Sequence, residues 1–162
     1  MKAQAEYETL VQLLRGRTVV RTRIMLFTLQ IYFGADPDDA RAFEWWCEPS
    51  WHVLGPDAVI TGSGAIDGPD TYAEDDEIAR ADATIAAASA ASKILIGQTL
   101  ETLTLDARTY ALHAEFSGGF RVATFLCAPD TDPLWVLRDP NQDLAVRATS
   151  RGLARGSRAG VV

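Results

Sequence analysis

The sequence has little of what most metal sites and nucleophilic active sites are built from. Its 162 residues contain two cysteines, Cys47 and Cys127, and two histidines, His52 and His113. None of them stands at the spacing of a zinc motif, and two cysteines make no disulfide framework. We therefore expect no metal and no other cofactor, with both cysteines acting as small buried core residues. These absences favour a protein without catalytic activity, although they do not exclude an enzyme.

Long hydrophobic runs and an excess of basic residues are also missing. No apolar run approaches the roughly 18 residues of a membrane span, and residues 1–6 lack the apolar segment of a signal peptide. We expect a cytoplasmic protein that does not bind membranes. Fifteen Lys and Arg residues stand against 22 Asp and Glu residues, which gives a formal net charge of -7. A general nucleic-acid binder needs a basic face, so we expect no nucleic-acid partner.

The negative charge is concentrated in the middle of the chain. Residues 34–82 hold thirteen acids and two arginines, a net charge of -11, and the remainder sums to +4. Part of this acidity has a structural role, because the helix dipole favours acids in the first turn of a helix. The rest is a candidate for function.

An internal repeat dominates the organisation of the chain. Residues 14–19 read Leu-Arg-Gly-Arg-Thr-Val, and residues 95–100 read Leu-Ile-Gly-Gln-Thr-Leu. Alternating apolar residues follow each copy, which is typical of β-hairpins. Each copy ends with a Trp-x4-Pro segment, at residues 51–56 and 135–140. Several matches in the same order indicate a duplicated unit.

We predict a helix between the two copies, over residues 71–95. Residues 71–74, Thr-Tyr-Ala-Glu, match a capping box, and an apolar stripe at spacings of three and four runs from Ile78 to Leu95. A shorter helix is expected at the N-terminus, because Tyr7, Leu10, Val11 and Leu14 share one helical face.

The predicted fold class is α+β, in one domain with pseudo-twofold symmetry. Each repeat is expected to be a β-meander of three or four antiparallel strands. The expected domain covers 1–149, with repeat one at 14–63, the linking helix at 71–95 and repeat two at 95–149. Residues 150–162 are rich in Arg and Gly and are expected to form a flexible tail, since glycine disfavours helix.

A candidate binding surface lies between the second and third predicted strands of repeat one. Residues 36–39, Asp-Pro-Asp-Asp, form an acidic loop that is longer than its counterpart at 117–119, Ser-Gly-Gly. Tryptophan beside a polar rim is typical of protein interfaces. Of the neighbours Trp45 and Trp46, one should face the core and the other should face outward. The predicted partner-binding residues are Asp36, Asp38, Asp39, Trp45, Trp46 and Trp51.

A smaller basic strip is expected in the first strand. Arg17, Val19, Arg21 and Arg23 stand at every second position, so all four side chains should lie on the same face of the strand. At this net charge we interpret the strip as a solvated sheet face in preference to a phosphate site.

The Leu-x-Gly strand openings, alternating hairpins and late tryptophans resemble those of small bacterial proteins, among them uncharacterised domains and immunity proteins encoded beside secreted toxins. The resemblance covers residues 14–61 and 95–148. It implies a cytoplasmic protein that binds a toxin domain and blocks its active site, often with acidic residues that match a nuclease's basic cleft.

The sequence therefore predicts a non-catalytic binding protein with a protein partner, such as a toxin domain. Two alternatives stay open. One is a small enzyme or ligand-binding domain with its site between the repeats. The other is a homodimeric structural module that associates through an exposed tryptophan.

Overall fold

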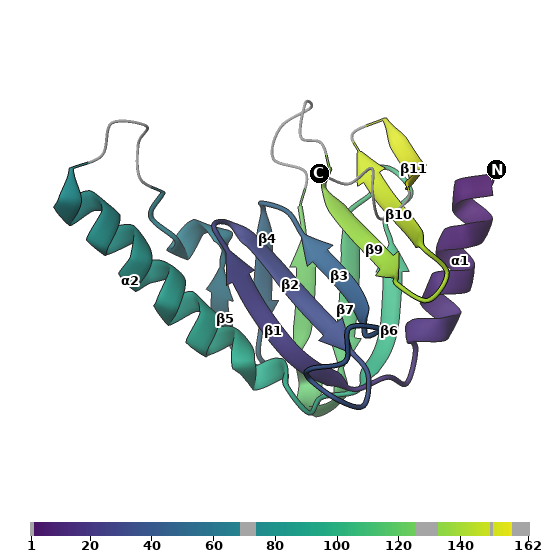
Figure 1. Ribbon diagram of the computed structural model, residues 1–162, viewed down its shortest axis with the longest axis horizontal. Helices are drawn as coiled ribbons and strands as arrows, with labels where there is room; N and C mark the ends of the chain where they lie inside the picture. The colour runs from purple at the N-terminus through teal and green to yellow at the C-terminus, as the bar shows by residue number, and fades with distance from the viewer. Residues whose placement is uncertain (1, 69–73, 126–132, 150, 157–162) are drawn as a thin grey trace.

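The architecture consists of two facing antiparallel sheets with a helix at each side (Figure 1). The computed structural model describes residues 2–68, 74–125, 133–149 and 151–156. The elements in chain order are α1 (Lys2–Leu14), β1 (Val19–Met25), β2 (Thr28–Phe33), β3 (Phe43–Cys47), β4 (Trp51–Leu54), β5 (Val59–Gly62), η1 (Ser63–Ala65), α2 (Asp75–Ser92), η2 (Lys93–Leu95), β6 (Leu100–Leu105), β7 (Leu112–Phe116), η3 (Ser117–Gly119), β8 (Arg121–Thr124), β9 (Trp135–Asp139), β10 (Leu144–Thr149) and β11 (Gly152–Gly156). The α+β prediction is confirmed.

The two repeats exchange their last strands. One sheet has the strand order β1-β2-β3-β9-β10-β11, and the other has the order β5-β4-β8-β7-β6. The first three strands of each repeat therefore pair with the last two of the other, through β3 with β9 and β4 with β8. Among the described residues, repeat one contributes β1–β5 and repeat two contributes β6–β10, five strands each and more than the three or four expected, and β11 follows repeat two at the edge of the larger sheet.

Reciprocal hydrogen bonds join the two copies where each helix leads into its first strand. The amide of Gly16 donates to the carbonyl of Leu100 at 2.8 Å, and the amide of Gly97 donates to the carbonyl of Val19 at 2.8 Å. Both glycines have positive φ, 79° and 86°, a region that favours glycine. The repeated Leu-x-Gly motif is thus a left-handed turn that recurs at equivalent places.

The centre of the molecule lies where equivalent residues meet. Thr18 forms an isolated antiparallel bridge with Thr99. The rings of Phe33 and Phe116 stack with centroids 6.4 Å apart and planes 6° apart. Residues from both sheets and from α1 and α2 form one continuous hydrophobic core. The expected pseudo-twofold relation therefore passes through the core.

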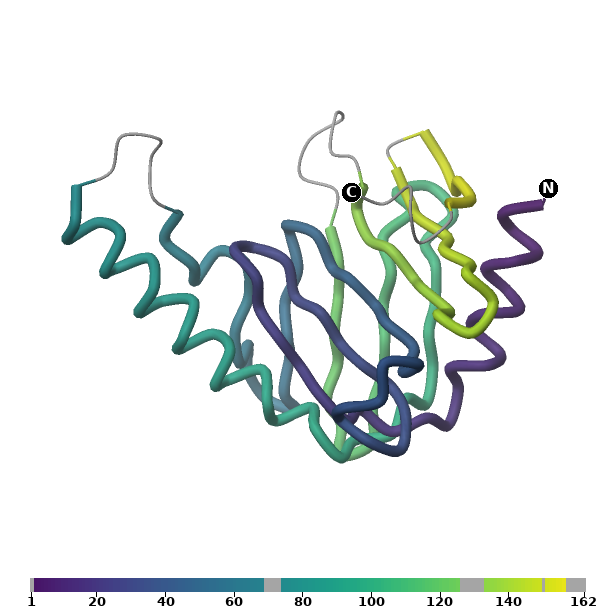
Figure 2. Tube along the Cα trace, in the orientation of Figure 1, coloured from purple at the N-terminus to yellow at the C-terminus, as the bar shows by residue number. Residues whose placement is uncertain are grey.

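The helices lie at opposite sides of the two sheets (Figure 2). Helix α2 packs against β1 and β5, and α1 packs against β9, β10 and β11. Among the described residues, no helix is both long and apolar enough to cross a membrane.

Two sequence-based boundaries need correction. Helix α2 begins at Asp75, and its N-cap is Glu74, which makes no side-chain capping bond. Thr71, the expected cap, lies outside the described residues. The predicted flexible tail is wrong for residues 152–156, because these residues pair with β10 as strand β11. Hydrogen bonding along β10 outweighs the low intrinsic strand preference of the glycines.

Candidate functional site

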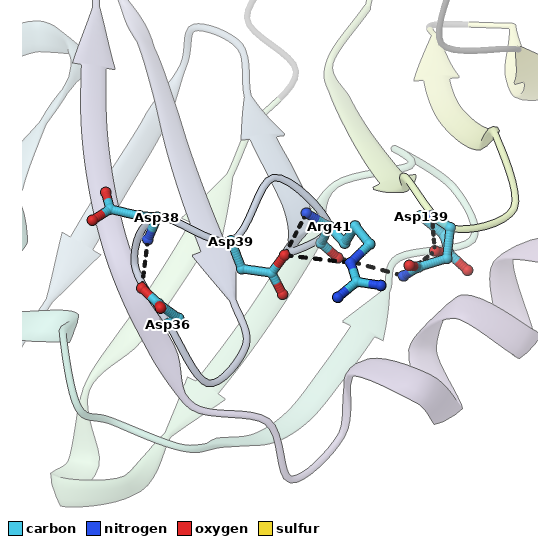
Figure 3. Close-up of polar contacts among 6 residues, drawn as sticks. Asp36, Asp38, Asp39, Arg41 and Asp139 are labelled. Atoms are coloured by element: carbon cyan, nitrogen blue, oxygen red, sulfur yellow. Dashed lines mark hydrogen bonds and ion pairs between the residues drawn. The ribbon is translucent and has the colours of Figure 1, made fainter.

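The acidic loop between β2 and β3 is held by its own side chains (Figure 3). The Asp36 carboxylate accepts a hydrogen bond from the amide of Asp38 at 2.9 Å, and the Asp39 carboxylate accepts one from the amide of Arg41 at 2.8 Å. The Asp39 amide also donates to the Asp36 carbonyl at 3.2 Å. Aspartates of this kind stabilise tight turns, so the loop is ordered before any partner arrives.

A contact with the β9–β10 turn fixes the loop to the rest of the molecule. The side-chain amide of Asn141 donates to the carbonyl of Arg41 at 3.4 Å. The carboxylate of Asp139, which is 2% exposed, accepts bonds from the backbone and side-chain amides of Asn141 at 2.9 and 3.2 Å. The loop of repeat one is thus attached to a turn of repeat two.

The loop presents its negative charge to solvent. Asp36 and Asp38 are exposed, and Asp39 is half-buried with a weak ion pair to the exposed Arg41 at 3.7 Å. Within the described ranges, the carboxylate of Asp38 has no hydrogen bond and no ion pair. Asp38 is therefore the acid of this loop whose charge is freest to meet a partner.

The three tryptophans of the predicted surface do not lie together on it. Trp45 and Trp51 have no exposed surface, and both belong to the core. Their assignment as partner-binding residues is wrong, because the β3 register turns Trp45 inward and the Trp51 indole N–H donates to the carbonyl of Phe27 at 2.6 Å. Trp46 is half-buried on the opposite face of β3, as the alternation predicts. A tryptophan-mediated dimer would thus depend on Trp46.

Trp46 is the centre of a small ordered cluster. Its indole N–H donates to the Glu44 carboxylate at 3.0 Å, and the Arg138 guanidinium lies over its ring at 4.7 Å. Arg138 also pairs with Glu44 at 3.3 Å, and the two side chains are 11% and 14% exposed. The cluster joins β3 to β9 and leaves part of the Trp46 ring accessible.

The sequence did not predict a groove between α1 and β6, with a volume of about 500 Å³. A smaller hollow of about 300 Å³ adjoins it and shares Val11, Gln12, Leu103 and Thr104. Burial, with a smaller contribution from Glu8, raises the pKa of Tyr7 to about 12, so this phenol on the wall of the groove stays protonated. Helix α2 covers β1, whereas α1 packs chiefly toward β9, β10 and β11. The groove combines side chains of α1 with side chains of β6 far along the chain, so no local sequence pattern signals it.

No assembled catalytic centre is visible in the described part of the chain. The Cys47 thiol is buried in the core, and burial raises its pKa well above the usual value. The prediction of a core role for Cys47 is confirmed, while Cys127 lies outside the described residues. The His52 ring packs edge-on against Phe125 at 4.9 Å. In the same ranges, no three His, Cys, Asp or Glu side chains gather to hold a metal ion.

The predicted basic strip, with Arg17, Arg21 and Arg23 on the same face as Val19, is not what β1 forms. A β-bulge between Val19 and Arg21 shifts the alternation, so Val19 is fully buried while Arg21 and Arg23 lie on the outer face. Arg17 lies before the strand and stacks over the Phe43 ring at 4.4 Å. The three arginines do not form one strip.

Searches against protein-family models, curated proteins and solved structures find no match to this chain.

Proposed function

We propose that this protein is a non-catalytic binding protein whose contact surface comprises the acidic loop and the Trp46 cluster. One observation carries the proposal: repeat one has the acidic loop between its second and third strands, and repeat two has only a short turn at the equivalent place. Repeat one connects β2 to β3 through residues 34–42, whereas repeat two connects β7 to β8 through the short η3. Folding does not require the longer connection, since the second copy does without it.

The loop has the properties of a preformed electrostatic contact. Its carboxylates are fixed by backbone hydrogen bonds and by the tie to Asn141, so binding costs little loss of conformational freedom. Exposed acids on a rigid loop steer a basic partner and speed its association. The half-buried Trp46 adds a residue type that is enriched in interface hot spots.

A basic cleft is the kind of partner surface that fits this loop. The resemblance to immunity proteins suggests a toxin domain, whose active site the loop would block. Such a complex forms through complementary charge, so its affinity falls as salt rises. Asp38 would contribute most among the loop acids, because its carboxylate is not engaged within the described residues.

The test uses the product of the gene that neighbours the gene for this protein, in titration calorimetry and in a growth-rescue assay. We expect a 1:1 complex that protects cells from the neighbour's toxicity. Asp38→Lys should weaken binding about tenfold or more at low salt, because a repulsive charge replaces an attractive one. Asp82→Lys, an equal charge change at an exposed position of α2, should leave the affinity within about twofold.

Two results would contradict the proposal. One is a neighbouring product that does not bind, and the other is an affinity that Asp38→Lys and Asp82→Lys lower equally. Binding without protection would support a binding protein and would exclude the immunity role.

The groove between α1 and β6 favours a second candidate, a ligand-binding domain. Its site lies between the N-terminal helix and repeat two, and not between the two repeats. Tyr7 and Val11 come from the helix that precedes the first copy, and Leu103 and Tyr110 come from the second. Its volume lies in the range of small-molecule sites. In an NMR screen of small organic fragments, hits should shift the signals of these four residues. Val11→Trp, which fills the groove, should abolish those shifts, and shifts that persist in this variant would reject the site.

A further inference from the structure

The outer face of the six-stranded sheet gathers arginines from strands that are distant in sequence. Directly paired residues lie on the same face of a sheet. One cross-strand row runs through Arg21, Tyr32, Glu44 and Arg138, and the next runs through Arg23, Gln30, Trp46, Val136 and Arg147. We call the surface formed by Arg21, Arg23, Arg138 and Arg147 the arginine face.

Three of these four arginines have no carboxylate partner in the described ranges. Arg138 pairs with Glu44, whereas Arg21, Arg23 and Arg147 form no ion pair there. The guanidinium of Arg21 stacks over the Tyr32 ring at 3.9 Å, which fixes its plane. The Nε atoms of Arg21 and Arg147 are buried without a hydrogen-bond partner. These guanidinium groups have given up part of their hydration without gaining a counter-charge.

The sign of this face is opposite to that of the molecule. The outward side chains of its strands include the four arginines and Glu44, and Glu48 directly follows β3 and accepts a hydrogen bond from Thr28 of β2. Counting both acids gives a local charge of +2. The whole chain carries -7, so the remainder carries -9. Because 22 acids outnumber 15 bases, a surface formed at random would be acidic. The arginine face is therefore a local reversal of charge.

We propose that the arginine face docks an acidic polypeptide segment of a partner protein. Four strand spacings of about 4.8 Å separate Arg23 from Arg147, so the cations extend over about 19 Å. An extended segment of about six residues spans that distance. Carboxylates pair with guanidinium groups through two parallel hydrogen bonds, which would give the unpaired arginines a counter-charge.

A peptide fits this face better than a nucleic acid does. A nucleic-acid strand carries regularly spaced phosphates over its whole length. Phosphates beyond the arginine face would be repelled by the rest of the molecule, which has a net charge of -9. The acidic loop lies at one end of the same strands, beyond Phe33 and Phe43. A short acidic segment can end before it reaches that loop.

The proposal is tested with a fluorescein-labelled peptide of about six glutamates, whose length matches the span of the face. Fluorescence anisotropy with the full chain at low salt should show saturable binding that added salt weakens. The double variant Arg23→Gln, Arg147→Gln should weaken binding about tenfold. The matched control Arg108→Gln, Arg151→Gln removes two exposed arginines elsewhere and should change the affinity by less than about twofold.

Three results would overturn the inference. They are an oligoglutamate that does not bind, equal losses in both double variants, and an oligothymidylate of equal length that binds more tightly than the peptide. Circular dichroism and thermal unfolding of each variant separate a lost contact from a lost fold. The inference does not rest on the acidic loop. The Asp38→Lys variant should therefore bind oligoglutamate at least as well as the wild type does.

Discussion

Two tryptophans in equivalent positions show how individual residues maintain the symmetry. The indole N–H of Trp51 donates to the Phe27 carbonyl at 2.6 Å, and that of Trp135 donates to the Tyr110 carbonyl at 2.7 Å. Each bond closes the loop of a hairpin from the same repeat over a fully buried ring. The matching Trp-x4-Pro segments in the sequence reflect this shared role.

Replacing either tryptophan by phenylalanine should destabilise the protein by a similar amount. Trp51→Phe and Trp135→Phe each leave a carbonyl without its donor and a small cavity, which together cost about 2 to 4 kcal/mol. Urea unfolding measures the loss. Trp46→Phe is the control and should cost less than about 1 kcal/mol, because that ring is half-exposed. A large loss for one buried tryptophan and none for the other would argue against equivalent roles.

Cys47 should be unreactive while the protein is folded. Burial raises the pKa of its thiol, so the thiolate that attacks disulfide reagents is scarce at pH 8, and the core blocks access. In a Cys127→Ser background, labelling by a chromogenic disulfide reagent should be slower than in concentrated guanidinium chloride by about a hundredfold or more. Equal rates in the two conditions would show that Cys47 is accessible, contrary to its position in β3.

At the scale of elements, the turn that leads from each helix into its first strand is the most regular feature. Gly16 and Gly97 have positive φ, and a methyl group at either would meet no atom within 4 Å. Strain in the backbone, without a steric clash, is therefore the expected cost of substitution.

Gly16→Ala and Gly97→Ala should each lower the free energy of unfolding by about 1 to 2 kcal/mol, measured by thermal or urea unfolding. Gly64→Ala is the matched control, since that position is equally open and has no positive φ. It should be neutral or slightly stabilising. An equal effect at all three positions would show that the left-handed turns are not needed.

Local patterns in the sequence predicted most of the elements and some of their faces. Alternation along β3 correctly separated Trp45 from Trp46, and the apolar stripe of residues 2–14 identified α1. The exchange of strands between sheets was not predictable in this way, because a meander and an exchanged pair have the same alternation. The β1 bulge and strand β11 also depend on pairing with neighbours. Burial of Trp51 was missed for the same reason.

At the scale of the molecule, neither repeat completes a sheet by itself. Strands β4 and β5 of repeat one extend the sheet of β6–β8, and β9 and β10 of repeat two extend the sheet of β1–β3. Separate fragments 1–68 and 74–156 should therefore lack dispersed amide signals in two-dimensional NMR spectra. Mixing the two fragments should restore the dispersion. A fragment 1–68 with the native spectrum would show that the repeats fold independently.

The candidate site was predictable only where it depended on local sequence. The acidic loop was visible because its length differs between the copies, and its aspartates fold back on neighbouring amides. The arginine face and the groove combine residues more than a hundred positions apart, such as Arg21 with Arg138. Pairing between distant strands decides those surfaces, and no short motif encodes it.

The exchange of strands has a consequence for stoichiometry. A symmetric pair of identical subunits with this architecture would present every surface twice and would capture two partners. Here both halves belong to one polypeptide, so each half is free to differ from the other. One half has kept a short turn where the other carries an acidic loop. The molecule therefore presents that loop once, and a complex with one partner per chain is the composition to expect.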